Sequence, residues 1–412
     1  MTYNPIAMRL LFVADGRSPI AQNWIRYFVT RGDKRSSPVD EVYLASTFAC
    51  PKDADFPLSG LEIIPVAFSA LKKVTQRPGT ASARTLGLRT AIRQWFGPLT
   101  IRRAADRLRG FIQEVKPDLV HAMRIPYEGM LAADAYTGIP LIVSTWGNDF
   151  TLHAPSTRLM SHYTHWTMQV ADALHADCHR DVRLAREWGF SEDKPNLVTP
   201  GNGGIRTDIF FPPAKPIEEP IIINPRGFRP YVCNDAFFKA IPFVLEKRPD
   251  ARFIFALMAG EPQAVQWIRE LETPALASGA SVGHAVELLP PLSHPQMADV
   301  FRRAQIVASP SIHDGTPNSL LEGIACGCFP VAGDLESIRE WITPNENGLL
   351  FDATEPSRIA NAILTALENK SLRQKAAGLN QNIIAARAEY GQNMQRVEEF
   401  YGKVLAMQVN NR

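Results

Sequence analysis

The sequence contains no uninterrupted apolar stretch of the roughly 18 residues that a membrane-spanning helix needs. Its first eight residues lack the charged start and the apolar block of a secretory signal. No charge dominates either, because 44 Lys and Arg stand against 42 Asp and Glu, a net charge of +2. This balance gives no reason to expect a nucleic-acid partner. These absences together predict a cytoplasmic protein.

Cysteine is scarce, and the motifs of common metal and cofactor sites are missing. The five cysteines are scattered and odd in number. Cys326-Gly-Cys328 lacks both the two-residue gap and the second ligand pair of a zinc site, so we expect buried thiols in a reducing compartment. No Asp-x-Asp motif stands at the end of a predicted strand. The first βα turn lacks the Gly-x-Gly-x-x-Gly of a dinucleotide fold. We therefore expect no metal and no cofactor.

At 412 residues the chain is too long for one ordinary core. Apolar runs alternate with helical stretches in both halves, which is typical of parallel sheets covered by helices. The stiff, proline-rich residues 212–220 resemble a linker. The predicted fold class is α/β, with two Rossmann-like doubly wound domains facing across a cleft. We place the first domain at 1–211 and the second at 221–390. The helix at 391–412 either packs back on the first domain or is a plain C-terminal helix on its own, second domain.

The most informative stretch runs from Ser309 to Gly327. An apolar strand ends at Pro310, and a loop then leads into a helix that begins at about Asn318. The unpaired N–H groups and the positive dipole end of such a helix favour a phosphate. Glu322 admits a second interpretation, because Ser319-x-x-Glu322 fits a capping box that needs no ligand.

The segment Asp314-Gly-Thr-Pro-Asn-Ser-Leu-Leu-Glu322, followed by Gly-Ile-Ala-Cys-Gly-Cys-Phe-Pro-Val-Ala332, resembles the signature of family 4 retaining glycosyltransferases. That family has two acids with seven residues between them, then a helix-ending glycine and a strand. Its first acid is usually Glu, one methylene longer than Asp314. The resemblance implies the two-domain GT-B architecture, with the donor in the second domain and the acceptor mainly in the first.

The family's donor contacts transfer to this chain residue by residue. Glu322 is expected to hold the ribose diol, and Asp314 to face the transferred sugar. Arg226 matches the family's diphosphate-binding arginine, whereas Tyr231 stands near the place where the family has a lysine. The resemblance thus implies donor binding by Arg226, Arg229, Tyr231, Gly315, Thr316, Pro317, Asn318, Ser319, Leu320 and Glu322.

The acceptor side has weaker signals. Gly16 and Arg17 lie in the first predicted turn, where the family places its acceptor. His121 matches the family's strand-end histidine, and Asn148-Asp149 resembles its short Gly-Ser-Asp-type turn. Each has an ordinary structural alternative, because turns and strand-end histidines are often satisfied by neighbouring groups. Asp314, Glu322, Arg226 and His121 are the predicted catalytic residues.

Residues 72–109 carry ten basic side chains and the single acid Asp106, with apolar residues at helical spacing. This pattern fits an amphipathic element on the inner, anionic face of a membrane, and it also fits a helix packed on its sheet.

The predicted function is metal-independent, retaining transfer of a sugar from a nucleoside diphosphate to a hydroxyl of a glycan or lipid-linked acceptor. The alternatives are a nucleotide-sugar epimerase and a catalytically weak nucleotide-sugar-binding protein.

Overall fold

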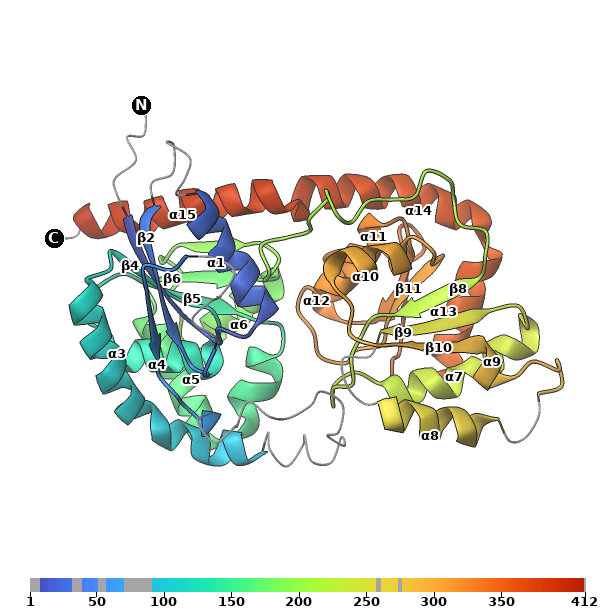
Figure 1. Ribbon diagram of the computed structural model, residues 1–412, viewed down its shortest axis with the longest axis horizontal. Helices are drawn as coiled ribbons and strands as arrows, with labels where there is room; N and C mark the ends of the chain where they lie inside the picture. Colours follow the sequence, from blue (N-terminus) through green and yellow to red (C-terminus); the bar gives the residue numbers. More distant parts are fainter. Residues whose placement is uncertain are drawn as a thin grey trace. The chain divides into compact units, whose positions relative to one another are not determined.

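The computed structural model describes residues 8–31, 39–50, 57–69, 91–256, 261–272 and 276–410. The described residues form two compact units, one from residues 8–204 and 391–410, the other from 205–390 (Figure 1). Each unit contains one all-parallel sheet with helices on it. The predicted α/β fold with two Rossmann-like domains is confirmed. No helix of the described residues is both long and apolar enough to cross a bilayer.

The sheet of the first unit has the strand order β3-β2-β1-β4-β5-β6-β7. Its strands are β1 (Met8–Ala14), β2 (Val39–Ser46), β3 (Gly60–Ile63), β4 (Leu119–Ala122), β5 (Leu141–Thr145), β6 (Ala173–Ala176) and β7 (Asn196–Val198). The α-helices are α1 (Pro19–Arg31), α3 (Ile101–Val115), α4 (Met130–Asp134), α5 (Arg158–Val170), α6 (His179–Glu187) and α15 (Tyr390–Asn410). The short turns of helix are η2 (Gly97–Thr100), η3 (Ile125–Gly129), η4 (Asp149–His153) and η5 (Ala154–Ser156).

The sheet of the second unit has the order β10-β9-β8-β11-β12-β13. Its strands are β8 (Ile221–Asn224), β9 (Arg252–Ala256), β10 (Val286–Leu289), β11 (Ile306–Ser309), β12 (Phe329–Gly333) and β13 (Leu349–Phe351). The helices are α7 (Asn234–Lys247), α8 (Glu261–Leu271), α9 (Val282–Ala285), α10 (His294–Phe301), α11 (Asn318–Ala325), α12 (Glu336–Arg339), α13 (Pro356–Glu368) and α14 (Lys370–Ile383), followed by η6 (Ile384–Ala388).

Burial on both faces explains the continuous apolar strands. In β9, Phe253 and Phe255 enter one hydrophobic cluster, while Ile254 between them enters the cluster on the opposite face. A parallel strand covered by helices on both sides therefore needs apolar residues at every position.

The strand orders locate the sites. Each order reverses its direction beside the first strand of its unit, between β1 and β4 and between β8 and β11. Open parallel sheets bind ligands at such switch points, beyond the carboxyl ends of the strands. The loops after β1, β4, β8 and β11 are therefore the places to search.

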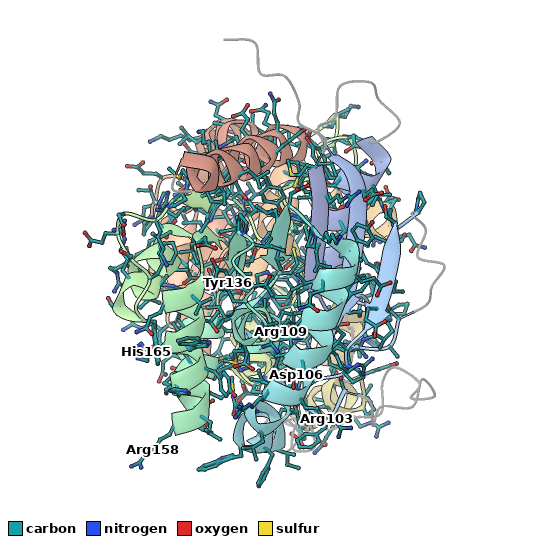
Figure 2. All side chains as sticks on the ribbon, turned by 90° about the vertical axis from the view of Figure 1, so that its left-hand side faces the viewer. Arg103, Asp106, Arg109, Tyr136, Arg158 and His165 are labelled. Atoms are coloured by element: carbon teal, nitrogen blue, oxygen red, sulfur yellow. The ribbon has the colours of Figure 1, made fainter. Side chains whose placement is uncertain are left out.

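The basic stretch 72–109 divides into parts with different outcomes. Residues 70–90 lie outside the described residues. In α3, Ile101, Ala105, Leu108 and Ile112 are buried in the core of the first unit. Arg103, Asp106 and Arg109 lie on its outer side (Figure 2). This part of the stretch is therefore an ordinary amphipathic helix on its sheet.

Candidate functional site

In the second unit, the switch point is spanned by an ion pair. Arg226 follows β8, and its Nη2 atom lies 2.6 Å from Oδ2 of Asp314, which follows β11. Both side chains are mostly buried, at 17% and 16% exposed. The side chain of Asn224, at the end of β8, accepts the backbone N–H of Arg226 and donates to Asn234. The structure thus brings together two residues that are 88 positions apart in the chain.

The loop between β11 and α11 is anchored along its length. Ile312 donates its backbone N–H to the carbonyl of Tyr231 at 3.0 Å, which ties the loop to the segment after β8. The hydroxyl of Ser337 donates to the Asp314 carbonyl at 2.7 Å, and the indole N–H of Trp341 donates to the Thr316 hydroxyl at 3.1 Å. Gly315 and Pro317 are buried within this loop. These bonds hold the backbone around Asp314 in place before any ligand arrives.

The start of α11 has polar groups that no other described residue satisfies. Asn318 is the first helical residue, after Pro317, and no described side chain caps the helix. Asn318 Oδ1 and Ser319 Oγ are buried without a hydrogen-bond partner within the described ranges. At the end of β11, Ser309 Oγ and Ser311 Oγ are also buried and have no hydrogen-bond partner among the described residues. Orphaned buried polar atoms are rare in folded proteins, and a cluster of them at a helix N-terminus indicates a ligand site.

Leu320 is one of the predicted donor contacts. Its side chain is fully buried in the core, and its N–H donates to the Pro317 carbonyl at 2.9 Å. The helix N-terminus therefore offers an anion the N–H groups of Asn318 and Ser319, for which the structure gives no described acceptor. Arg229 is exposed and Tyr231 is half-buried, so both side chains are accessible for the donor contacts predicted for them.

Glu322 is not a capping-box residue. Because α11 begins at Asn318, Glu322 is the fifth residue of the helix, too far along to cap the first turn. Its side chain is half-buried, and burial raises the pKa of the carboxyl group to about 7. No basic side chain of the described residues forms an ion pair with it. An unpaired carboxylate in this position costs stability, so its presence points to a ligand.

In the first unit, the turn after β1 is tightly packed. Gly16 is buried, and an added Cβ there would come within 2.7 Å of Cys50 Sγ. Arg17 is exposed, forms an ion pair with Asp15 at 2.8 Å and places its guanidinium 3.7 Å from the centre of the Phe48 ring. Of these two predicted residues, only Arg17 presents a side chain to a ligand.

Asp149 anchors its loop. Its carboxylate is fully buried, pairs with Arg124 Nε at 2.9 Å and accepts the backbone N–H groups of Ile125 and Trp146. Burial raises the pKa of this carboxyl group, and Arg124 opposes that shift. Asn148 Oδ1 accepts a second hydrogen bond from Arg124. These contacts give Asp149 a structural role, and its acceptor-side role stays a prediction.

His121 is likewise a packing residue. It is 1% exposed, with Nδ1 bonded to the Tyr401 hydroxyl and Nε2 bonded to Ser144 Oγ at 2.7 Å. The chain of bonds continues from Ser144 to His175 at 2.9 Å. Burial lowers the pKa of His121 well below the ordinary value, so the ring is neutral. Both ring nitrogens are thus occupied inside the unit, which favours the structural alternative for His121, and its catalytic role stays a prediction.

This chain of hydrogen bonds begins at Trp24, whose indole N–H donates to the Tyr401 oxygen. It ends at the Thr199 hydroxyl, which lies 2.9 Å from His175 Nε2. If both histidines carry their proton on Nε2, each group donates to the next one along the chain. The network connects α15 with α1 and β4, and no motif in the sequence predicts it.

Two further groups were not predicted, Arg124 and Glu128. Arg124 serves as the counter-ion described above. Glu128 lies in η3 after β4, is 6% exposed and accepts a hydrogen bond from the Thr47 hydroxyl at 2.8 Å. Burial raises the pKa of Glu128 to about 7. The available signal was an acid directly after a buried strand, in Ile125-Pro-Tyr-Glu-Gly129, which matches no familiar motif.

A cluster of metal-ligating side chain types lies after β6. Ligand atoms of Asp177, Cys178 and Asp181 lie within 4.8 Å of one another, and all three residues are buried. However, the guanidinium of Arg180 lies 2.7 Å from Asp181 Oδ1 and balances the negative charge. A guanidinium in this position disfavours a second cation, so we assign no metal to this cluster.

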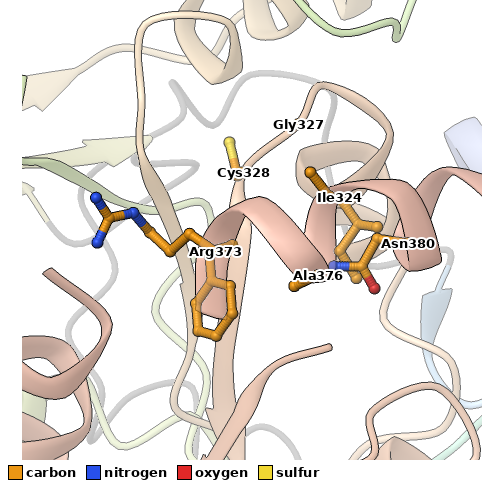
Figure 3. Close-up of a pocket in the computed structure, with 8 residues that line it drawn as sticks. Ile324, Gly327, Cys328, Arg373, Ala376 and Asn380 are labelled. Carbon is orange, nitrogen blue, oxygen red and sulfur yellow. The ribbon is translucent and has the colours of Figure 1, made fainter. Parts of the chain in front are cut away.

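Cys326, Cys328 and a small cavity lie at the C-terminal end of α11, away from the switch point of the second unit. All five cysteines are free thiols, and Cys326 and Cys328 are buried as predicted. A cavity of about 10 Å³ near Cys328 is lined by Ile324, Arg373 and Asn380, among others (Figure 3). It has room for about one water molecule. It lies at the C-terminal end of α11 and is no candidate for a nucleotide.

Comparisons with known proteins identify the family. Residues 205–382 match the family described as glycosyl transferases group 1, and residues 65–201 match the glycosyl transferase 4-like domain. D-inositol 3-phosphate glycosyltransferase of Thermobispora bispora is 26% identical over 250 residues, covering 58% of this chain and 57% of that protein. The enzyme of the same name from Xylanimonas cellulosilytica is 28% identical over 225 residues, covering 50% and 51%. The chain spans about half the length of the curated relatives it matches.

Solved structures resemble the chain over nearly its whole length. Sucrose-phosphate synthase from Thermosynechococcus elongatus has a TM-score of 0.71 at 14% identity, covering 97% of this chain and all of that one. Anabaena Alr3699/HepE in complex with UDP and glucose has a TM-score of 0.68 at 15% identity, covering 96% and 100%. At such identities the likeness establishes the fold.

Proposed function

We propose, from the premise that this chain belongs to the group 1, family 4 glycosyltransferases with the GT-B fold, that it transfers a sugar from a nucleoside diphosphate to an acceptor hydroxyl. The arrangement at the second switch point carries the proposal. The groups in question are Arg226 after β8, four orphaned polar atoms from the end of β11 to the uncapped start of α11, and the unpaired Glu322 in the second turn of α11. A donor that has a diphosphate, a ribose diol and a sugar would satisfy this set of groups.

Each group has a proposed role. The guanidinium of Arg226 and the N–H groups of Asn318 and Ser319 bind the diphosphate. Negative charge builds on this diphosphate as the bond to the anomeric carbon breaks. Because these groups are fixed beforehand, they stabilise the transition state more than the ground state. Glu322 accepts hydrogen bonds from the ribose hydroxyls, and Asp314 faces the transferred sugar. The absent lysine leaves Arg226, with Arg229 at the rim, as the cations nearest to the phosphates.

The finer features of the reaction follow the family resemblance. We propose retention at the anomeric carbon, transfer without a metal, and the departing phosphate as the base that takes the acceptor's proton. An acceptor of glycan or lipid-linked type fits this scheme. UDP, which HepE binds in its solved structures, is the first nucleotide to test.

Ligand-dependent stabilisation tests the proposal. A ligand at 100 times its dissociation constant stabilises the folded state by roughly 2.7 kcal/mol. We expect UDP or another nucleoside diphosphate to raise the melting temperature, and its sugar ester to be consumed with transfer to an added glycan or polyol. A panel of uridine, guanosine and adenosine diphosphates that leaves the melting temperature unchanged would contradict the proposal. Formation of an epimer without transfer would instead favour a nucleotide-sugar epimerase.

We also propose peripheral contact with an anionic membrane through an exposed apolar surface of the first unit. This surface comprises Ile92, Trp95, Phe96 and Leu99, which are 45%, 63%, 54% and 67% exposed. The exposed Arg102 and Arg103 follow directly at the start of α3. Aromatic rings in the interface and arginines on lipid phosphates are the usual means of such contact.

Vesicle sedimentation checks the membrane contact. We expect the protein to pellet with vesicles that contain phosphatidylglycerol, and to remain in the supernatant with phosphatidylcholine alone or at high salt. Substitution Trp95→Ser together with Phe96→Ser should reduce the pelleted fraction several-fold. Phe243, which is 54% exposed in the second unit, offers a matched control in Phe243→Ser. Equal recovery with both lipids would refute the contact.

A further inference from the structure

Glu128 occupies the switch point of the first unit. It follows β4 within η3, while Asp15 follows β1 and Thr47 follows β2. These three strands are neighbours in the order β2-β1-β4, so the three polar residues lie at the carboxyl edge of adjacent strands. This edge is where open parallel sheets bind ligands. It corresponds to the place of Arg226 and Asp314 in the second unit.

The surroundings of Glu128 do not account for a buried carboxylate. Its Oε1 atom accepts one hydrogen bond from another residue, the hydroxyl of Thr47 at 2.8 Å. Within the described residues it forms no ion pair. A neutral glutamine would make the same bond to Thr47 without the cost of burying a charge.

Asp149 at the same edge provides the contrast. It is equally buried, but it has Arg124 at 2.9 Å and two backbone N–H donors. One carboxylate of this edge is therefore satisfied by the protein, and the other is not. Burial raises the pKa of Glu128 to about 7, with the charge of Asp15 adding to this shift and Arg124 opposing it. The group therefore changes its charge close to neutral pH.

We infer that Glu128 binds the acceptor by accepting a hydrogen bond from a hydroxyl group of a polyol or sugar. The inference rests on the proposed glycosyl transfer and names the acceptor contact in the first unit. An ionised carboxylate can accept hydrogen bonds but cannot donate them. Every acceptor substrate of this reaction carries a hydroxyl group that can donate to it. The bond fixes the position of the acceptor, and no covalent step is assigned to Glu128.

The test compares two reactions of the purified full chain. The donor is whichever of UDP-glucose, GDP-mannose and ADP-glucose the wild type consumes fastest. The acceptor is either water alone or the best of D-inositol 3-phosphate, glycerol and methyl glucoside. The variant Glu128→Gln retains the shape of the side chain and its capacity to accept from Thr47. We expect its KM for the acceptor to rise about tenfold, while the KM for the donor and the rate of donor hydrolysis are unchanged.

The pH profile separates binding from a structural role. The transfer rate is measured at a donor concentration that saturates the enzyme at every pH, so that protonation of Glu322 does not limit donor binding. Under these conditions the rate of the wild type should rise with pH through about 7 as Glu128 ionises, and Glu128→Gln should lose this rising limb of the pH profile. Thr47→Val removes a hydrogen bond that lowers the pKa of Glu128, so it should move the limb to higher pH. A merely structural Glu128 would leave the limb in place in both variants.

The outcomes separate the inference from its premise. A wild type that turns over no donor refutes glycosyl transfer and the acceptor contact with it. An active wild type whose acceptor KM and pH limb survive Glu128→Gln refutes the contact alone. Equal losses in donor hydrolysis and in transfer also refute it, because they indicate general damage to the fold. A selective loss of acceptor affinity, with the limb shifted in Thr47→Val, supports it.

Discussion

Replacing Glu322 with alanine should weaken the binding of the donor nucleotide by two to four orders of magnitude. Two hydrogen bonds from the ribose hydroxyls to an ionised carboxylate contribute roughly 1.5–3 kcal/mol each, and each 1.4 kcal/mol is a factor of ten in affinity. The structure supports this assignment because Glu322 lies beyond the capping positions of α11 and has no ion-pair partner among the described residues. Isothermal titration with UDP, or with the nucleotide that stabilises the protein best, measures the loss.

The control for this variant is Glu355→Ala. Glu355 is also an acid in the second unit, at the start of α13, but it is exposed and its side chain caps no helix within the described ranges. Its removal should leave the affinity for the nucleotide unchanged. Donor binding should also weaken as pH falls through about 7, because the Glu322 carboxyl group then takes up a proton. Unchanged affinity in Glu322→Ala would leave this residue without a role in the donor site.

Local patterns in the sequence predicted the second unit well. The continuous apolar run at Ile306–Ser309 and the glycine and proline positions up to Asn318 placed β11 and α11 correctly. These features are predictable because they depend on neighbours in the chain, through burial, turn formation and helix capping. The pairing of Arg226 with Asp314 was not predicted, since it joins residues whose proximity depends on the order of the strands.

The first unit shows where such patterns fail. His121 ends a strand, as a substrate-binding histidine would, and nothing local distinguishes it from a buried one. Its partner Tyr401 is 280 residues away, on the helix that closes the unit. For Glu128 the prediction from sequence fails in the opposite sense. Its burial and position resemble those of a functional acid, but its turn matches no motif. Residues that depend on long-range packing require the fold to be known.

The pH dependence of stability combines two opposing sets of buried groups. His175 is neutral in the folded chain, with its pKa lowered by burial to about 4 from an ordinary 6.5. The unfolded chain takes up this proton first, so stability is lost as pH falls from about 6.5 toward 4. His121 acts in the same direction. Glu128 and Glu322 act in the other, because a pKa raised from 4.5 to about 7 means that stability is lost as pH rises through this window.

Replacing both acids with glutamine should therefore raise stability most at alkaline pH. A pKa raised from 4.5 to about 7 corresponds to a loss of roughly 3 kcal/mol of stability per site at pH 8, where the wild-type carboxylates are ionised, and of roughly 1 kcal/mol at pH 5. From pH 8 to pH 5 the variant Glu128→Gln/Glu322→Gln should consequently lose roughly 5 kcal/mol more than the wild type. Urea unfolding at both pH values measures this difference, and Glu355→Gln should follow the wild type. An equal change in the free energy of unfolding between pH 8 and pH 5 for the double variant and the wild type would mean that burial destabilises neither ionised carboxylate. The stability cost from which we infer ligand-binding roles for both residues would then be absent.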